Sequence, residues 1–172
     1  MPTSMAIVFG STTGYTEDLA YKIREALGAD LVTVREVQAT SIDKMQDYDV
    51  LILGVPTWHH GKLQSDWADR VEDLTDQNFH GIKVALFGSG DSERYPDNFQ
   101  DAMGLLWEKF DALGAELIGK WPVEGYDFKE SRGLCDDDTK FVGLAFQKYD
   151  SEAVIDERIQ AWAQQLRGEL GL

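Results

Sequence analysis

The sequence predicts an α/β protein, a three-layer sandwich in which helices cover both faces of a five-stranded parallel sheet. Short apolar runs alternate along the chain with segments of helical periodicity, which is typical of consecutive strand–helix–strand units. The strongest run, residues 49–55, is apolar from its second residue onward, as expected for a central strand buried on both faces. Right-handed crossovers between parallel strands then place helices on both sides of the sheet.

The length of 172 residues fits one domain spanning residues 1–172. The hydrophobic content of 43% is ordinary for a globular protein. Because no repeat, low-complexity tract or linker interrupts the pattern, we expect a single folded unit.

The first half of the chain begins with an apolar strand at residues 5–9 and a helix at 17–27. A second strand at 31–35 alternates apolar and polar residues, and a short helical turn follows Ser41. The central strand at 49–55 completes this half.

The second half continues the alternation and contains one irregular excursion, between residues 121 and 139, which we interpret as an inserted segment. The expected elements are a helix at 65–75, a strand at 82–87, a helix at 101–113, strands at 115–119 and 141–146, and a helix that begins at a Ser151 cap and runs to about residue 170.

The loop between the first strand and the first helix, Gly10-Ser11-Thr12-Thr13-Gly14-Tyr15-Thr16, suits a phosphate. Backbone N–H groups and the positive end of the helix dipole favour an anion there, and four hydroxyls add donors. The alternative is a hydroxyl-rich helix cap that binds nothing. The loop lacks the Lys and spacing of a nucleotide P-loop, the Gly-x-Gly-x-x-Gly of a dinucleotide site, and the cysteine nucleophile of a phosphatase loop.

Two further loops, at residues 56–61 and 88–98, follow parallel strands and are therefore expected at the same edge of the sheet. Trp58 and Tyr95 could sandwich a flat ring, and Asp91 could accept a ring N–H. Gly61 and Gly90 allow close approach of the backbone. A phosphate site, an aromatic sandwich and a ring N–H acceptor together describe flavin mononucleotide (FMN).

Each of these residues also has an ordinary structural interpretation. Trp58 and Tyr95 could be packing residues, Asp91 a turn residue, and His59 and His60 exposed loop residues. No third His or Cys stands at ligand spacing beside the two histidines, so a metal site is not expected.

The formal net charge of −15 and the pI of about 4.4 argue against nucleic acid and anionic membranes as partners. They favour transient partners with basic docking faces, although a merely soluble acidic protein is the alternative. The single cysteine, Cys135, excludes an internal disulfide, fits the reducing cytoplasm and is interpreted as a structural or incidental thiol. No signal peptide or membrane-spanning run is visible.

The whole chain resembles the flavodoxin family, specifically its long-chain branch, for which a strand order of 2-1-3-4-5 is expected. Tyr15, where most members have Asn, is similar to the second flavodoxin of some proteobacteria. The excursion around Phe128 resembles the loop that splits the last strand of long-chain members. The motifs that carry the resemblance are GSTTGYTE at 10–17, LGVPTW at 53–58, ALFGSGD at 85–91, WPVEGY at 121–126 and FVGLA at 141–145.

The resemblance implies three groups of FMN-binding residues and no catalytic or metal-binding residue. The phosphate group comprises Ser11, Thr12, Thr13, Gly14, Tyr15 and Thr16. Trp58 and Tyr95 would flank the ring, Asp91 would accept its N3–H, and His59, His60 and Gly61 would contact its N5 edge. Residues that would line the cofactor are Thr57, Ser89, Gly90 and Asn98.

Two positions depart from the family pattern. Gln147 stands where an Asp often contacts the ribityl chain, and whether it makes that contact is open. The ring of Tyr15 could either project to solvent or cover the phosphate.

The resemblance also implies that a peptide bond of the loop at residues 56–61 flips when the flavin is reduced. The candidate here is the His59–His60 peptide, and flipping it costs more than flipping a peptide that contains glycine.

We therefore expect a low-potential one-electron carrier and not an enzyme, working as a monomer between a reductase and acceptor enzymes in the cytoplasm. An FMN-dependent quinone or nitro reductase is the alternative. A phospho-receiver domain would need an Asp after the first strand, where Ser11 and Thr12 stand. A further hypothesis is that protonation of His59 or His60 near neutral pH raises the potential of the bound flavin.

Overall fold

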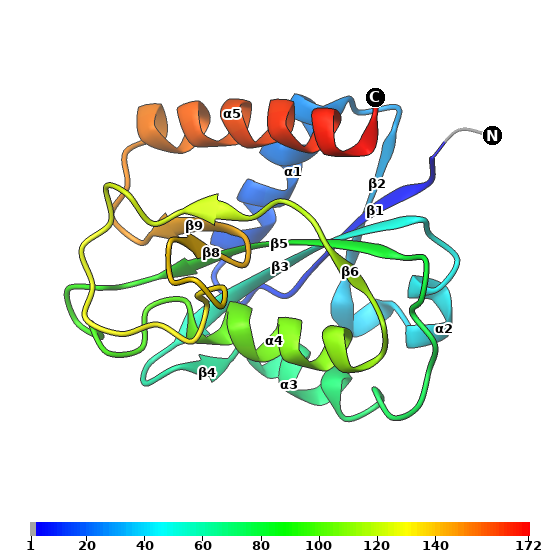
Figure 1. The fold of residues 1–172 in the computed structure, drawn as a ribbon, viewed down its shortest axis with the longest axis horizontal. Coiled ribbons are helices and arrows are strands. Elements are labelled where there is room, and N and C mark those ends of the chain that lie inside the picture. The colour runs from blue at the N-terminus through cyan, green and yellow to red at the C-terminus, as the bar shows by residue number, and fades with distance from the viewer. Residues whose placement is uncertain (1–2) are drawn as a thin grey trace.

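The computed structural model describes residues 3–172 and consists of a central sheet between two layers of helices (Figure 1). All strand pairs along the main path of the sheet are parallel. The order is β2 (Val32–Glu36), β1 (Met5–Phe9), β3 (Val50–Trp58), β5 (Lys83–Gly90) and β6 (Glu116–Leu117), with β9 (Leu144–Gln147) also on β5. The predicted order 2-1-3-4-5 is therefore confirmed.

The fifth strand position is divided between two short strands. β6 pairs with the start of β5, where Lys83 faces Glu116, and β9 pairs with its end, where Phe87 faces Leu144. The chain between them, residues 118–143, is the inserted segment, and it contains the antiparallel pair β7 (Trp121–Pro122) and β8 (Lys140–Phe141). The predicted strand at 141–146 is consequently two strands, which separate where Gly143 packs against the Leu86 carbonyl.

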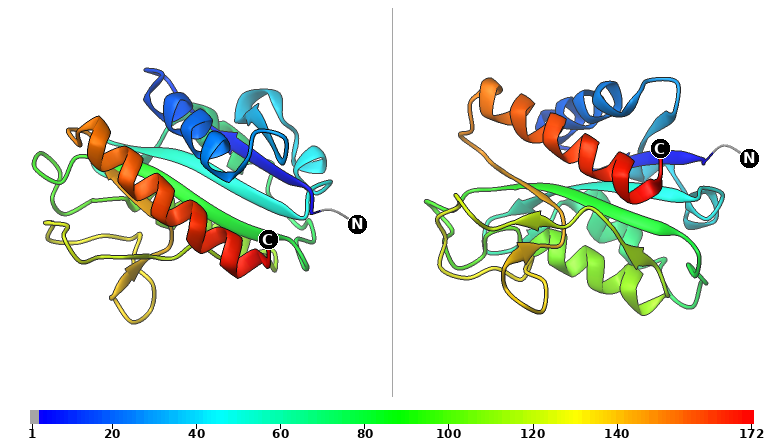
Figure 2. Two further views of the ribbon diagram at one scale, coloured as in Figure 1. Left: turned by 90° about the horizontal axis from the view of Figure 1, so that it is seen from above. Right: turned by 45° about the horizontal axis from the view of Figure 1, so that its top comes forward.

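Helices α1 (Tyr15–Leu27) and α5 (Glu152–Leu170) lie side by side over one face of the sheet (Figures 1 and 2). The other face is covered by α2 (Ile42–Met45), α3 (Ser65–Val71) and α4 (Asp101–Ala112), with a 3₁₀ turn, η1 (Val37–Ala39), after β2. No helix within residues 3–172 is long and apolar enough to cross a membrane.

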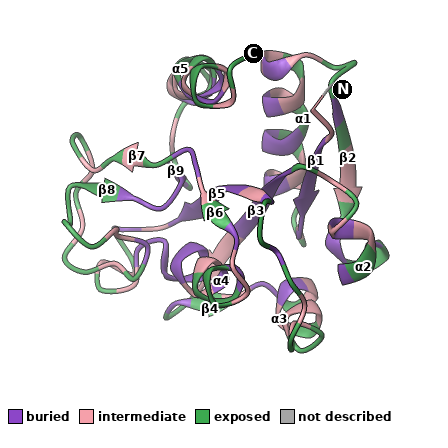
Figure 3. Ribbon diagram, turned by 45° about the vertical axis from the view of Figure 1, so that its right-hand side comes forward, coloured by how far each residue is buried: buried purple, intermediate pink, exposed green. Residues whose placement is uncertain are grey.

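The core is two apolar clusters, one on each face of the sheet, and Figure 3 shows the strands buried between the layers. In β1, Ala6 and Val8 belong to the cluster under α3 and α4, whereas Ile7 and Phe9 belong to the cluster under α1 and α5. Successive side chains of a strand point to opposite faces, so a strand between two helical layers must be apolar throughout. This explains why the predicted buried runs were correct.

The ends of several elements differ from the prediction. β3 continues to Trp58, because Trp58 pairs with Lys62 of the short strand β4 (Lys62–Leu63). β5 continues to Gly90 because it pairs there with Gln147. The helix predicted at 65–75 ends at Val71. The two strand ends depend on pairing, with a nearby residue for Trp58 and a distant one for Gly90, and an apolar run does not reveal that pairing.

Candidate functional site

Three loops leave the carboxyl ends of β1, β3 and β5 and approach one another. We call residues 10–14 the first loop, residues 59–61 the second loop and residues 91–98 the third loop. His59 Nδ1 of the second loop lies 3.4 Å from the Tyr95 hydroxyl of the third. Tyr15, next to the first loop, and Ser92 of the third loop both bond to Gln147. The loops that the sequence places at one edge therefore meet there.

The first loop presents hydrogen-bond donors to solvent. Gly14 occupies the N-cap position of α1 with φ 90°, and its N–H donates to Ser11 Oγ (3.0 Å). Thr12 and Thr13 are exposed, whereas Thr16 is buried. Within residues 3–172, no side chain caps α1, and the N–H groups of Thr12, Thr13, Tyr15 and Thr16 donate to no protein acceptor.

These donors decide between the two interpretations of the first loop. A hydroxyl-rich cap would direct a side-chain oxygen to the first N–H groups of the helix, and no such bond is found in the described part of the chain. The free N–H groups at the positive end of α1 instead suit an anion. The residues present therefore fit a phosphate.

The side chain of Gln64 supports the first loop from the protein interior, a role that the sequence patterns did not indicate. Its Nε2 donates to Thr12 Oγ1 (3.2 Å), while its Oε1 caps α3 by accepting from Trp67 N (3.3 Å). A side chain at Gly10 would collide with Gln64 and Trp67. Gln64 is fully buried, so the first loop rests on a fixed polar group.

The second loop is a tight connection between Trp58 and Lys62, which pair across β3 and β4. His59 has φ 46° and Gly61 has φ 88°, so both residues are left-handed. A Cβ at Gly61 would lie 2.6 Å from Asp101 Oδ2, which makes glycine necessary there. Asp101 lies at the start of α4 and holds Asn98 and Arg132 by hydrogen bonds.

The predicted ring-flanking residues, Trp58 and Tyr95, are both half-buried at this edge. The Tyr95 ring packs edge-on against His60, with centroids 5.1 Å apart, and against His59 at 6.2 Å. Among the described residues, Trp58 makes no ring contact with Tyr95. Tyr95 is therefore held by the two histidines, which are themselves exposed.

The third loop uses its own polar side chains to hold its shape. Asp91 Oδ1 accepts from Arg94 N (3.0 Å), and the Asp91 carbonyl accepts from Tyr95 N (2.8 Å). Asn98 Nδ2 donates to Asp101 Oδ2 (3.0 Å). Asp91 therefore does act as a turn residue. Its other carboxylate oxygen, Oδ2, has no hydrogen-bond partner within residues 3–172.

Three other predicted residues line the strands behind these loops. Thr57 Oγ1 accepts from Ala102 N (3.1 Å) and so helps to cap α4. Ser89 and Gly90 are buried in β5. A Cβ at Gly90 would lie 3.2 Å from the Phe99 ring, so the backbone here is close to the segment that precedes α4.

Tyr15 neither projects freely to solvent nor ends over the first loop. Its hydroxyl donates to the Gln147 carbonyl (3.3 Å). Burial raises the pKa of Tyr15 to about 12, and the nearby Asp150 carboxylate adds to the rise. The amide of Gln147 bonds to Ser92.

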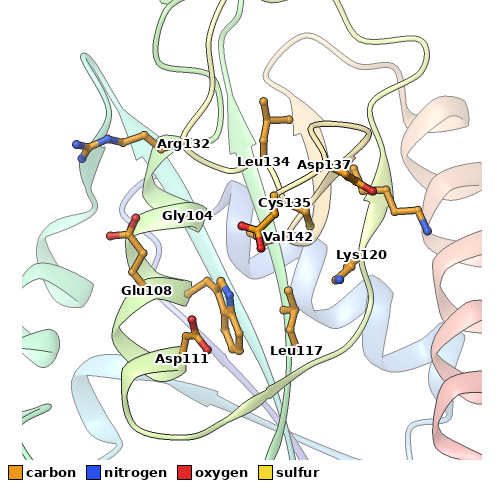
Figure 4. A pocket seen from close by; sticks show the side chains of 13 residues that line it. Gly104, Glu108, Asp111, Leu117, Lys120, Arg132, Leu134, Cys135, Asp137 and Val142 are labelled. Atoms are coloured by element: carbon orange, nitrogen blue, oxygen red, sulfur yellow. The ribbon is translucent and has the colours of Figure 1, made fainter.

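A separate hollow of about 680 Å³ lies between α4 and the inserted segment (Figure 4). Its walls include Trp107, Lys120 and Cys135, and none of the predicted site residues. Burial raises the pKa of the Cys135 thiol, which agrees with a structural thiol. In the part of the chain that the structure describes, no three His, Cys, Asp or Glu side chains group to hold a metal.

Comparison with known proteins agrees with this geometry. The flavodoxin family model matches residues 7–149, which include all three loops. A flavodoxin of Picosynechococcus sp. is 46% identical over 171 residues, covering 99% of both chains, and Flavodoxin 2 of Salmonella typhi is 43% identical over 97% of this chain and 96% of its own.

A solved structure of Fusobacterium nucleatum flavodoxin bound to flavin mononucleotide superposes with a TM-score of 0.89 at 22% identity, covering 97% of this chain and 98% of that one. This likeness confirms the fold. The family match and the two relatives, which span almost the entire chain, go further: the protein belongs to the flavodoxin family, and its length fits the long-chain branch.

Proposed function

We propose that this protein is a low-potential one-electron carrier that holds FMN non-covalently and moves electrons between a reductase and acceptor enzymes. Flavodoxins are electron-transfer proteins and not enzymes. The observation that carries the proposal is the set of free N–H groups in the first loop, opposite a Trp and a Tyr on neighbouring loops. A phosphate and a flat ring on one molecule would use both features.

Each loop has a part in the proposed site. Residues 11–16 would hold the phosphate by hydrogen bonds and the α1 dipole, since the first loop has no Lys or Arg. Trp58 and Tyr95 would cover the two ring faces, with the Asp91 carboxylate at the ring edge. The second loop would face the N5 edge, and Thr57, Ser89, Gly90 and Asn98 would line the remainder. FMN supplies the redox chemistry, and the chain supplies binding, exclusion of water and electrostatics.

The charge of the protein supports the low potential and the choice of partners. With a net charge of −15, the chain opposes the addition of negative charge to a bound ring, because like charges repel strongly where water is excluded. The same charge would guide a monomer to partners with basic faces in small, transient contacts. We include cytoplasmic localisation in the proposal, supported by the single cysteine.

Spectroscopy of the FMN-loaded protein during stepwise dithionite reduction tests the proposal. We expect tight FMN binding, two separate one-electron stages, and no reduction by NADPH until a flavodoxin reductase is added. Failure to bind FMN would contradict the proposal. Direct reduction by NAD(P)H with turnover of a quinone or nitro compound would favour the alternative FMN-dependent reductase.

His59 and His60 form part of the proposal as tuning residues. Both are exposed and contact Tyr95, so a proton on either would add positive charge close to a ring beside Tyr95. Potentiometry of His59→Ala and His60→Ala between pH 5.5 and 8 should show a smaller change of potential with pH than the unaltered protein. An unchanged slope in both variants would remove the histidines from the proposal.

A further inference from the structure

Gln147, the last residue of β9, has every polar atom in a hydrogen bond and is only 6% exposed. Its carbonyl accepts from the Tyr15 hydroxyl (3.3 Å), and its Oε1 accepts from Ser92 N (3.3 Å). Its Nε2 donates to Ser92 Oγ (2.7 Å). The residue thus contacts two segments that are far apart in sequence.

The two contacts of Gln147 lead to opposite parts of the site. Tyr15 is the first residue of α1 and directly follows Gly14 of the first loop. Ser92 belongs to the third loop and directly follows Asp91. One side of Gln147 therefore holds the end of the site with the free N–H groups, and the other side holds the loop that carries Asp91 and Tyr95.

The backbone of Gln147 is itself fixed. Its N–H donates to Asp150 Oδ2 (2.7 Å), and its carbonyl also accepts from Asp150 N (3.0 Å). Arg158 Nη1 donates to the same carboxylate oxygen (2.6 Å), and Arg158 Cζ lies 4.6 Å from the centroid of the Tyr126 ring in the inserted segment. The Asp150 side chain is 10% exposed. Its ion pair with Arg158 is therefore largely shielded from water, and it supports the backbone of Gln147.

We propose that Gln147 is a positioning residue that sets the first loop and the third loop at the separation that FMN needs. The inference rests on the proposed FMN function and assigns no direct contact between Gln147 and the cofactor. A ligand that spans from a phosphate to a flat ring binds well only if its two ends are held in register. Gln147 provides that register because it bonds to both sides at once.

An amide suits this position better than the other side chains of its size. The Ser92 N–H needs an acceptor, and Ser92 Oγ accepts a hydrogen bond. The Gln147 amide supplies both an acceptor oxygen and a donor N–H. Leucine would fill the volume and leave the N–H of the buried Ser92 without its acceptor, while Ser92 Oγ would keep only its contact with the Tyr149 hydroxyl (3.3 Å). Gln147→Leu therefore removes the link to the third loop and keeps the packing, while the backbone carbonyl that accepts from Tyr15 is retained.

Affinities for FMN and riboflavin, measured by quenching of flavin fluorescence in the full chain, test the inference. Riboflavin lacks the phosphate, so comparing the two ligands separates the two ends of the site. Tyr15→Phe should reduce the ratio of FMN to riboflavin affinity three- to tenfold, because it loosens the first loop. Ser92→Ala should weaken both ligands about equally, and Gln147→Leu, which also leaves the Ser92 N–H without its acceptor, should weaken both by a larger and similar factor, at least tenfold.

Gln165→Leu is the matched control, because Gln165 also donates its amide to a distant backbone carbonyl, that of Lys120, away from the three loops. It should leave both affinities within twofold. Denaturant unfolding of each apoprotein separates a stability loss from a binding loss. If Gln147→Leu lowers stability and leaves both affinities within twofold, Gln147 is merely structural and the inference is wrong.

If Gln147→Leu does not fold, Tyr15→Phe and Ser92→Ala, which each remove one hydroxyl, test the inference without it. Equal losses of FMN and riboflavin in Tyr15→Phe, or unchanged affinities in both deletions, would overturn the inference. Absence of FMN binding by the unaltered protein would instead overturn the proposed function and the inference with it. These outcomes therefore distinguish failure of the inference from failure of the proposed function.

Discussion

The first loop and the third loop end at one edge of the same sheet, yet they use their polar groups in opposite ways. In the first loop, Thr12 and Thr13 are exposed, and their N–H groups donate to no acceptor within residues 3–172. In the third loop, Asp91 and Asn98 bond to their own loop or to Asp101 of α4. The first loop leaves these donors without an acceptor in the described part of the chain, whereas the third loop uses its polar side chains to maintain its own conformation.

This difference has a consequence for substitutions. The first loop owes its shape to the left-handed Gly14 and to the contact of Thr12 Oγ1 with Gln64, so removal of the Thr13 hydroxyl should have little effect on folding and removal of the Thr12 hydroxyl only a small one. The third loop depends for its shape on Asp91, a side chain that is also proposed to bind the ring. Changes there should affect stability and binding together.

The double variant Thr12→Val with Thr13→Val should show the largest effect. Each hydroxyl hydrogen bond to a charged phosphate contributes about 1.5 kcal/mol, so losing two should weaken FMN about 100-fold. The unfolding free energy of the apoprotein should fall by about 1 kcal/mol at most, because Thr12 Oγ1 accepts from the buried Gln64 amide and Thr13 is exposed. Fluorescence titration and urea unfolding measure the two quantities.

Thr33→Val, at an exposed position of β2, is the control for this double variant and should change neither quantity. A loss of apoprotein stability equal to the loss of FMN binding would show that the first loop is as self-supporting as the third. The contrast between the two loops would then disappear.

Alkaline pH should reveal the buried hydroxyl beneath the third loop. Tyr126 of the inserted segment donates to the Ala145 carbonyl (2.6 Å), and burial raises its pKa to about 12. The folded protein therefore holds this proton more tightly than the unfolded chain, so stability is complete below pH 10 and declines as the pH rises toward 12. Between pH 9 and pH 11 we expect a loss of about 1 kcal/mol in unfolding free energy from this group.

Urea unfolding at pH 9, 10 and 11 checks this decline, which Tyr126→Phe should make smaller. Tyr15, whose pKa is also raised to about 12, adds a decline of the same sign that remains in this variant. Tyr21→Phe, at an exposed position of α1, is the control. Equal slopes for Tyr126→Phe and the unaltered protein would contradict the prediction.

The strands and helices were predictable from the sequence because their signals are local, whereas the strand order came from the resemblance to the family. The apolar run of β1 and the helical stripe of α5 each indicate an element without reference to the rest of the chain. Ser151 was also recognisable as a helix cap, and it accepts the N–H of Val154. The split of the last strand came from the resemblance to the family, not from the pattern.

The supports of the site were not predictable in the same way. Gln64 reaches Thr12 and Gln147 reaches Ser92 across more than 50 positions of sequence. A polar residue beside a strand or helix looks like a surface residue until the fold shows that it is buried. The binding residues were therefore recognisable as a set, whereas the residues that hold them in place were not.

Asp91→Ala should lower the unfolding free energy of the apoprotein by about 1 kcal/mol, because the N–H of Arg94 loses its acceptor. Asp91→Asn retains an acceptor oxygen and should lose less. Asp97→Ala, at an exposed position of the same loop, is the matched control and should stay within about 0.5 kcal/mol. If all three variants unfold alike, the Asp91 carboxylate does not stabilise the turn, and the third loop resembles the first in this respect.

The smallest effect should come from the second loop, where two adjacent histidines are expected to respond with opposite sign. His59 is left-handed at φ 46°, whereas His60 is not among the residues with positive φ. Glycine at 59 relieves a strain of about 1–2 kcal/mol and loses about 0.5–1 kcal/mol through the greater entropy of the unfolded chain. His59→Gly should therefore stabilise the apoprotein by about 0.5 kcal/mol, and His60→Gly should destabilise it by a similar amount. Urea unfolding of the two variants side by side measures the difference, and destabilisation by both would mean that the contact of His59 with Tyr95 contributes more than the backbone strain costs.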